Sequence, residues 1–358
     1  MRPQLTNPGE LPFLFQRQFE LCRVKAGETI VCLSDQGTRP EYLAASFAAA
    51  RSLGANIYNM TVSEQPSWTR VGIETVGNCK GAVEALKAAD MLIAMHVPLF
   101  TQWMKEVRAA GTRVLMVVDH PDNLRSQMST QDVKVATLYS RDRLGKARRI
   151  RITNEAGTDL TANIGEFPSL CQYGFADEPG HFDHWGAGHC YTFPNEGSAN
   201  GTVVIQPGDI IVLPYNRFVI DPIHVEVRDG FIRKIEGGLD ARLMRHWLEG
   251  NRKRPDDQDG FAISHMGWGT NPYCRYDVIA IDGDDPEHSN GAVRGFAGNF
   301  LFSTGPNTQG GGTRKTTGHY DVPMKECTIE LDGEVVVERG QFVDRKMAAR
   351  MEPRLGTA

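Results

Sequence analysis

The feature that most constrains the fold of this chain is a change in hydrophobic periodicity near residue 148. Before it, from about residue 28, short apolar runs such as residues 29–33 and 91–95 alternate with helix-like stretches. Strands that alternate with helices are connected by right-handed crossovers, which produce a mainly parallel sheet. We therefore expect an N-terminal α/β lobe over residues 1–147. No G-x-G-x-x-G follows its first strand, so a dinucleotide site is not indicated.

After this point the chain has the pattern of antiparallel strands joined by tight turns. Residues 149–153 alternate polar and apolar side chains, and Asp332-Gly333 is a strong hairpin signal. One helix, over about residues 240–250, interrupts the strands. The sequence thus predicts an α/β protein, in which a β-rich, mostly antiparallel C-terminal domain over residues 148–358 follows the α/β lobe.

Charge and cysteine content exclude several classes of function. The formal net charge is −5, so no basic field suggests nucleic acid or an anionic membrane as a partner. The seven cysteines form no C-x-x-C pair, which argues against a disulfide framework and a thiolate zinc site. The N-terminus lacks the apolar core of a signal peptide, and no apolar stretch reaches the length of a membrane span. We expect a cytoplasmic protein.

Histidines in the C-terminal third suggest a metal site. His265 lies in the glycine-rich segment 263–269, and His319 and Asp321 are two residues apart. In an extended segment, alternate side chains share a face, so His319 and Asp321 would point the same way. Two histidines and one carboxylate are the ligand set of non-heme Fe(II) oxygenases, which leaves positions open for substrate and O2. The alternative is that each histidine is a hydrogen-bonded residue of a half-buried strand, because H-x-D also arises by chance.

Two further segments also carry polar groups. Residues 173–185 combine carboxylates, histidines and aromatic rings, which fits either a polar surface loop or groups that move protons beside a site. The glycine-rich segment 310–316 is not a phosphate loop, because no glycine directly precedes Lys315 and no helical pattern follows. We expect it to be a flexible loop near the site. His96 either faces a ligand crevice at the sheet edge or is held by the backbone.

Several motifs together resemble a known family. They are residues 176–180 (ADEPG), 183–185 (DHW), 263–269 (ISHMGWG) and 299–308 (NFLFSTGPNT). This set is similar to the 2,5-dihydroxypyridine 5,6-dioxygenases, the ring-cleaving enzymes of bacterial nicotinate and nicotine catabolism. The resemblance covers most of the chain and is strongest over residues 170–335. The family is related in fold to metal-dependent aminopeptidases.

The resemblance implies an activity and a set of site residues. A member would use Fe(II) and O2 to convert 2,5-dihydroxypyridine to N-formylmaleamate by cleaving the C5–C6 bond. The implied iron ligands are His265, His319 and Asp321, the same set that the spacing suggests. The implied pocket residues are Glu178, His184 and His189 as candidates for proton transfer, and Arg294 and Ser303 as candidates for substrate binding.

Other functions stay open at this point. A metal-dependent aminopeptidase with two metals needs bridging carboxylates and more ligands than the three found by motif. A dioxygenase for another dihydroxypyridine or a related ring, and a non-catalytic binding protein of the same fold, are also compatible with the sequence. A cytoplasmic enzyme of this kind is expected to form a closed homo-oligomer.

Overall fold

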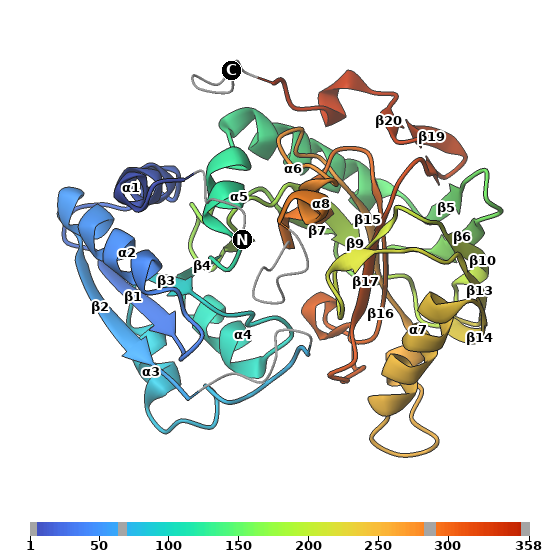
Figure 1. Cartoon of the computed structure of the whole chain (residues 1–358), viewed down its shortest axis with the longest axis horizontal. Helices are drawn as coiled ribbons and strands as arrows, with labels where there is room; N and C mark the ends of the chain where they lie inside the picture. Colours follow the sequence, from blue (N-terminus) through green and yellow to red (C-terminus); the bar gives the residue numbers. More distant parts are fainter. Residues whose placement is uncertain (1–5, 64–69, 283–290, 352–358) are drawn as a thin grey trace.

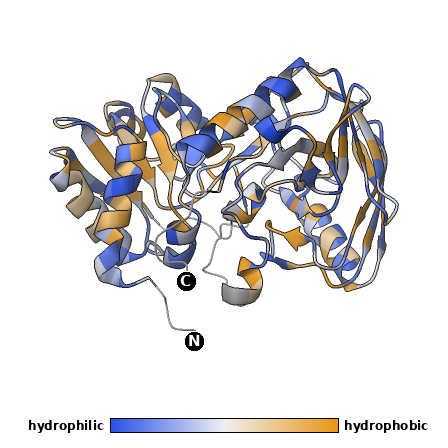
Figure 2. Cartoon of the chain, turned by 90° about the horizontal axis from the view of Figure 1, so that it is seen from above, coloured by the Kyte–Doolittle hydropathy of each residue, from blue (hydrophilic) through white to orange (hydrophobic). Residues whose placement is uncertain are grey.

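The computed structural model describes residues 6–63, 70–282 and 291–351 and arranges them in two lobes side by side (Figure 1). The N-terminal lobe is blue to cyan in Figure 1, and the β-rich part runs from green to red. Figure 2 shows that apolar residues gather on the strands inside both lobes, whereas the outward faces of the helices are largely polar. Each lobe therefore has a hydrophobic interior, as expected for a chain of this length, and one core cluster contains residues of both lobes.

The N-terminal lobe is built on a five-stranded parallel sheet in the order β2-β1-β3-β4-β8. The central strands β3 and β4 are buried throughout, because helices cover both faces of such a sheet. This confirms the expected α/β lobe. The strands are β1 (Thr29–Ser34), β2 (Asn56–Thr61), β3 (Met91–Ala94), β4 (Arg113–Met116) and β8 (Phe182–His184). The helices are α1 (Leu11–Leu21), α2 (Pro40–Ser52), α3 (Ala82–Lys87), α4 (Gln102–Ala109) and α5 (Pro121–Ser126).

The last strand of this sheet comes from beyond residue 148. Strand β8 pairs in parallel with β4, and His184 lies opposite Met116. The carboxyl end of β8 is thus at the same sheet edge as the carboxyl ends of β3 and β4. The division of the chain at residue 147/148 stays a prediction, and one strand of the second part completes the sheet of the first.

The second part contains an eight-stranded and a five-stranded sheet, both antiparallel. This confirms the expected β-rich, mostly antiparallel structure. The eight-stranded sheet has the order β14 (Phe231–Gly237), β13 (Ile223–Arg228), β10 (Asn200–Ile205), β6 (Asp159–Asn163), β5 (Arg149–Thr153), β18 (Thr328–Leu331), β19 (Glu334–Glu338) and β20 (Gln341–Phe342). The five-stranded sheet has the order β17 (Tyr320–Met324), β16 (Phe300–Thr304), β15 (Ile263–Gly269), β9 (His189–Thr192) and β7 (Leu170–Gln172). A short pair, β11 (Ile210–Ile211) and β12 (Arg217–Phe218), and the helices α7 (Leu239–Gly250) and α8 (Val278–Asp282) complete this part.

Helix α6 (Gln131–Lys146) connects the two parts and packs on β7 and β9. Thr130 is the N-cap residue of this helix, and its side chain accepts a hydrogen bond from Val133 N. The face that it buries includes Ala136, Thr137 and Ser140, so its apolar stripe is weak. The sequence pattern did not predict this helix for that reason. Among the described residues, no helix is both long and apolar enough to cross a membrane.

Candidate metal centre

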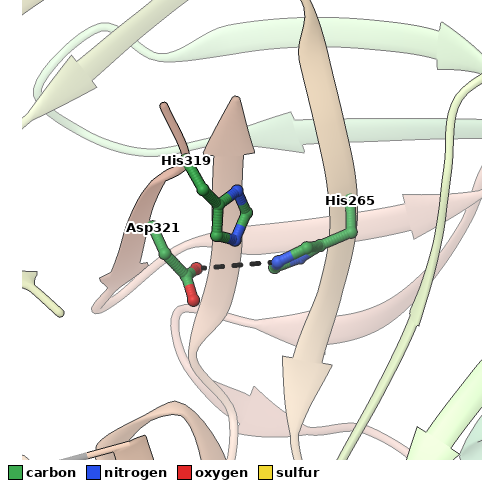
Figure 3. A group of neighbouring side chains, drawn as sticks. All are labelled: His265, His319 and Asp321. Atoms are coloured by element: carbon green, nitrogen blue, oxygen red, sulfur yellow. Dashed lines mark ion pairs between the residues drawn. The ribbon is translucent and has the colours of Figure 1, made fainter. Parts of the chain in front are cut away.

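The five-stranded sheet brings the two histidine segments together (Figure 3). His265 lies on β15, Asp321 lies on β17, and His319 comes just before β17. Strand β16 runs between them and places the small side chain of Ser303 opposite Asp321. A register shift in the pairing of β15 with β16, between Ile263 and Met266, interrupts the ladder at His265. Such bulges redirect a side chain.

The three side chains have the geometry of a ligand set. Their candidate ligand atoms all lie within 4.8 Å of one another, and all three residues are buried. His265 Nε2 is 3.9 Å from Asp321 Oδ1, and the rings of His265 and His319 are 5.2 Å apart between centroids. In Figure 3 the three side chains converge, His265 from β15, Asp321 from β17 and His319 from the residue just before β17. Spacing alone had placed His319 and Asp321 on one face, and the fold adds His265.

Unsatisfied polar atoms show that this group suits a cation. His319 Nδ1 lies 2.7 Å from the carbonyl oxygen of Thr304, which fixes the tautomer and leaves the lone pair on Nε2. Within the described residues, His319 Nε2 and Asp321 Oδ1 are buried without a hydrogen-bond partner. Buried polar atoms are seldom left without one. A metal ion between them would satisfy both atoms.

The protonation states agree with metal binding. Burial lowers the pKa of His265 to about 3, and burial also lowers the pKa of His319. Both imidazoles are therefore neutral near pH 7, the state in which a histidine coordinates a metal. The donor set of imidazole nitrogen and carboxylate oxygen is compatible with Fe(II).

Arg294 and Ser303, the predicted substrate residues, both lie at this centre. Arg294 Nη1 is 3.4 Å from Asp321 Oδ2, so the guanidinium interacts with one carboxylate oxygen and leaves Oδ1 to face the histidines. The Ser303 hydroxyl accepts a hydrogen bond from His265 N at 2.8 Å and donates one to His265 O at 2.9 Å. These two bonds replace the interrupted strand ladder and position His265. Binding of substrate by either residue stays a prediction.

His189 is the predicted proton-transfer residue that interacts electrostatically with Arg294 and His265 of the centre. It begins β9, where it pairs with Gly269 and stacks on Tyr191 at 5.7 Å. Burial lowers its pKa well below the usual value, and electrostatic interactions with Arg294, His265 and His184 lower it further. His189 is therefore neutral near pH 7. Its Nδ1 has no hydrogen-bond partner in the described part of the chain.

His184 and Glu178 lie in different surroundings. His184 is fully buried, and its Nε2 is 3.2 Å from Asp119 Oδ1 at the carboxyl edge of the parallel sheet. The Glu178 side chain is 62% exposed and pairs with Lys134 at 3.2 Å. Lys134 also binds the buried Asp177 at 2.6 Å. The structure thus places Glu178 in a surface ion pair, and its role in proton transfer stays a prediction without a contact to support it.

Aromatic side chains that sequence reasoning missed form walls around the two histidines. The ring centroid of Tyr191 is 5.2 Å from that of His265, and the centroid of Phe193 is 6.3 Å from it. Phe100 of the N-terminal lobe lies 5.2 Å from His319. His189, Tyr191 and Phe193 are spaced by two residues. The two-residue period of a strand could therefore have identified Tyr191 and Phe193 from the sequence. Nothing near Phe100 in the sequence indicates its place.

Fold and centre together define a class: an α/β lobe joined to antiparallel sheets that carry a buried two-histidine, one-aspartate group suited to a metal ion. The sequence profile of the 2,5-dihydroxypyridine 5,6-dioxygenase family matches residues 10–344. The chain therefore belongs to the 2,5-dihydroxypyridine 5,6-dioxygenase family.

Known relatives agree with this assignment. A 2,5-dihydroxypyridine 5,6-dioxygenase of Pseudomonas putida is 34% identical over 343 residues, which cover 94% of this chain and 96% of that protein. The solved structure of the 2,5-dihydroxypyridine dioxygenase from Pseudomonas putida KT2440 matches with a TM-score of 0.90 and 33% identity, over 96% of this chain and 99% of that one. AmpT from Thermus thermophilus shares the fold, with a TM-score of 0.64 and 12% identity over 94% of this chain and 99% of its own.

Proposed function

We propose that this protein is an Fe(II)-dependent dioxygenase that converts 2,5-dihydroxypyridine and O2 to N-formylmaleamate by cleaving the C5–C6 bond. The observation that carries the proposal is the convergence of buried, unsatisfied ligand atoms of His319 and Asp321 beside His265, in a chain of this family. The proposal includes both the identity of the metal and the assignment of these three residues as its ligands.

The chain's own groups account for how such a metal would be held. When bound by two neutral imidazoles and one carboxylate, Fe(II) offers free positions to substrate and O2 and allows electron transfer between them. Thr304 orients His319, and the Ser303 hydroxyl holds the main chain of His265. Arg294 interacts with Asp321 Oδ2, which keeps the other carboxylate oxygen turned toward the histidines.

Proton transfer is assigned to the imidazoles beside the centre. The substrate hydroxyl must lose a proton when it binds, and a buried neutral base is suited to receive it. His189 has this character, with an unpartnered Nδ1 among the described residues. His184 is held by Asp119 at 3.2 Å and influences His189 electrostatically, so it fits a second position in the same proton path. Glu178 is the weaker candidate because its side chain faces solvent.

The aromatic walls suit a planar heterocycle. Tyr191 and Phe193 approach His265, and Phe100 approaches His319, so flat apolar faces surround the proposed iron position. Such faces favour stacking with an aromatic ring and exclude water from it. Another dihydroxypyridine would meet the same surfaces, and direct comparison of ring substrates tests the choice.

The proposal extends to location and assembly. All seven cysteines are free thiols, as expected in a reducing cytoplasm: Cys79 is exposed, Cys171 is partly exposed, and the other five are buried. We propose a cytoplasmic homo-oligomer, and light scattering of the purified protein measures its mass.

The decisive experiment is anaerobic loading with Fe(II), addition of 2,5-dihydroxypyridine, and measurement of O2 uptake with loss of the ultraviolet band of the substrate. We expect uptake of one O2 per substrate, which disappears in His319→Ala together with bound iron. His224→Ala is the matched control, because His224 is an exposed histidine of β13. Iron-loaded protein that consumes no O2 with this substrate would contradict the proposal. Peptide hydrolysis with two bound metals would favour the aminopeptidase instead.

A further inference from the structure

A large cleft opens between the two lobes. Its volume is about 1160 Å³, far more than one substituted pyridine ring fills. Helix α4 and the segment before it line one side, and residues 306–317 line the other. The glycine-rich segment that was expected near the site therefore forms part of the cleft wall.

Two lining residues connect this cleft with the metal centre. Phe100 lines the cleft and also contacts His319 at a centroid distance of 5.2 Å. Gln309 lines it too, and its Oε1 is 3.5 Å from the Tyr191 hydroxyl, whose ring lies against His265. The cleft is thus separated from both metal-ligand histidines by a single layer of side chains. A molecule that enters or leaves the centre on this side passes through the cleft.

The charge of the cleft is opposite to that of the whole chain. The formal net charge is −5, yet the described lining contains the cations Lys105, Arg108, Lys253 and Lys315 and the single carboxylate Glu74. Glu74 Oε1 accepts a hydrogen bond at 2.5 Å from Gln102 N at the start of α4. The negative charge of Glu74 is therefore partly balanced by the positive end of the helix dipole. A basic cleft in an acidic protein concentrates anions.

Arg108 is the cation closest to the chemistry. Its Nε donates a hydrogen bond to Gly180 O at 2.9 Å, which fixes the guanidinium at the cleft wall. Burial lowers the pKa of Arg108, and the Tyr191 hydroxyl opposes that shift, which places Arg108 within electrostatic reach of Tyr191. In the part of the chain that the structure describes, no carboxylate forms an ion pair with Arg108, and its two terminal nitrogens make no hydrogen bond to the protein. Half-buried arginines of this kind are suited to bind a carboxylate through two parallel bonds.

The proposed reaction creates such a carboxylate. Cleavage between C5 and C6 incorporates both atoms of O2. The hydroxyl-bearing C5 becomes a carboxyl group, and C6 becomes a formyl group on nitrogen. A carboxyl group with a pKa of ~4 is ionised at neutral pH, so a substrate without a carboxylate becomes an anionic product. Only the product offers the group that a guanidinium binds in a bidentate way.

We propose that Arg108, with Lys105 on the same wall of the cleft and Lys315 on the opposite wall, forms a carboxylate-binding subsite that receives the ring-opened product. The inference rests on the proposed function for the identity of the anion, whereas the subsite itself rests on the contacts of Arg108 and the charges of the cleft. It follows that anionic product analogues bind the protein and that the neutral substrate does not compete for this position.

The test uses maleamate, which is the product without its formyl group, and titrates it calorimetrically into the metal-free protein. We expect Arg108→Gln to weaken maleamate binding on the order of 10- to 100-fold, as for the loss of a hydrogen-bonded charge pair. Neutral maleamide should bind weakly to both proteins. Lys105→Gln should weaken maleamate binding by about 3-fold, because an exposed lysine contributes less than the guanidinium.

The controls separate this inference from misfolding and from the proposed function. Arg149→Gln removes the same charge from an exposed position of β5 and should leave maleamate binding unchanged. Lys105→Gln spares the bond to Gly180, so its effect tests the subsite even if Arg108→Gln is unstable. Maleamate that binds equally well to the wild type, Arg108→Gln and Lys105→Gln would overturn the subsite, and so would active protein that binds none. Anion binding that depends on Arg108 in a protein without dioxygenase activity would retain the subsite and reject the function.

Discussion

The two sides of the centre differ in how they are built. On the side of the antiparallel sheet, the candidate ligands are buried on or next to strands, and hydrogen bonds with the Thr304 carbonyl and the Ser303 hydroxyl hold the two histidines in place. On the side of the N-terminal lobe, Phe100 and Arg108 belong to a loop and a short helix that line an open cleft. The first side determines where a metal can be held. The second determines what reaches it, so changes to the two sides should affect different measurements.

The largest effect within this comparison is expected for His189→Gln on the sheet side. Glutamine keeps a polar group at this position but removes a base that is neutral near pH 7. We expect kcat to fall about 10²- to 10⁴-fold while the iron content stays unchanged. Metal analysis and O2 uptake on the same sample measure both quantities. If His189→Gln keeps full turnover, His189 is not the base, and His184 or Glu178 becomes the candidate for proton transfer.

Ser303→Ala distinguishes positioning from substrate binding. The substitution removes both hydrogen bonds to the main chain of His265. We expect the affinity for iron to fall about 10- to 100-fold, the usual effect of losing a group that orients a ligand. KM for the substrate should change little at saturating iron. A raised KM with unchanged iron affinity would instead support the prediction that Ser303 binds substrate.

The smallest effect, and one confined to the N-terminal lobe, concerns pH and His96. Burial lowers the pKa of His96 from 6.5 to about 4, and Asp35 opposes the shift. Between these values the unfolded chain binds the proton and the folded chain does not, so the free energy of unfolding falls as the pH falls from 6.5 to about 4. The loss is at most about 1.4 kcal/mol per pH unit.

His96→Gln should remove this part of the pH dependence, measured by urea unfolding of the metal-free protein at pH 7 and pH 5. His224→Gln, at an exposed position of β13, is the control. An unchanged pH dependence in His96→Gln would show that the lobe does not bury His96 in its neutral form. Iron affinity should be the same in all three proteins, because His96 lies outside the sheet that carries the centre.

The residues on the sheet side of the centre could be predicted from the sequence, whereas those on the side of the N-terminal lobe could not. His319 and Asp321 could be placed together from sequence because a strand repeats every two residues, and the alternation of helices with strands identified the parallel sheet. Phe100 and Arg108 could not be found in this way, because they come from the other lobe, and only tertiary packing brings Phe100 to His319 and Arg108 to the cleft beside the centre. Glu178 shows the converse: it lies in a motif of the family, yet its side chain points to solvent and pairs with Lys134.

Strand β8 also determines when the first lobe can form. Its three residues, Phe182–His184, complete the parallel sheet beside β4 although they are made long after the other strands. A nascent chain that ends near residue 147 would expose the backbone of β4 as an unpaired edge, which invites pairing with other chains. The N-terminal segment alone is therefore expected to aggregate. It should become soluble only when it is extended past residue 184. Part of the second half of the chain must therefore be synthesised before the sheet of the first lobe can be completed.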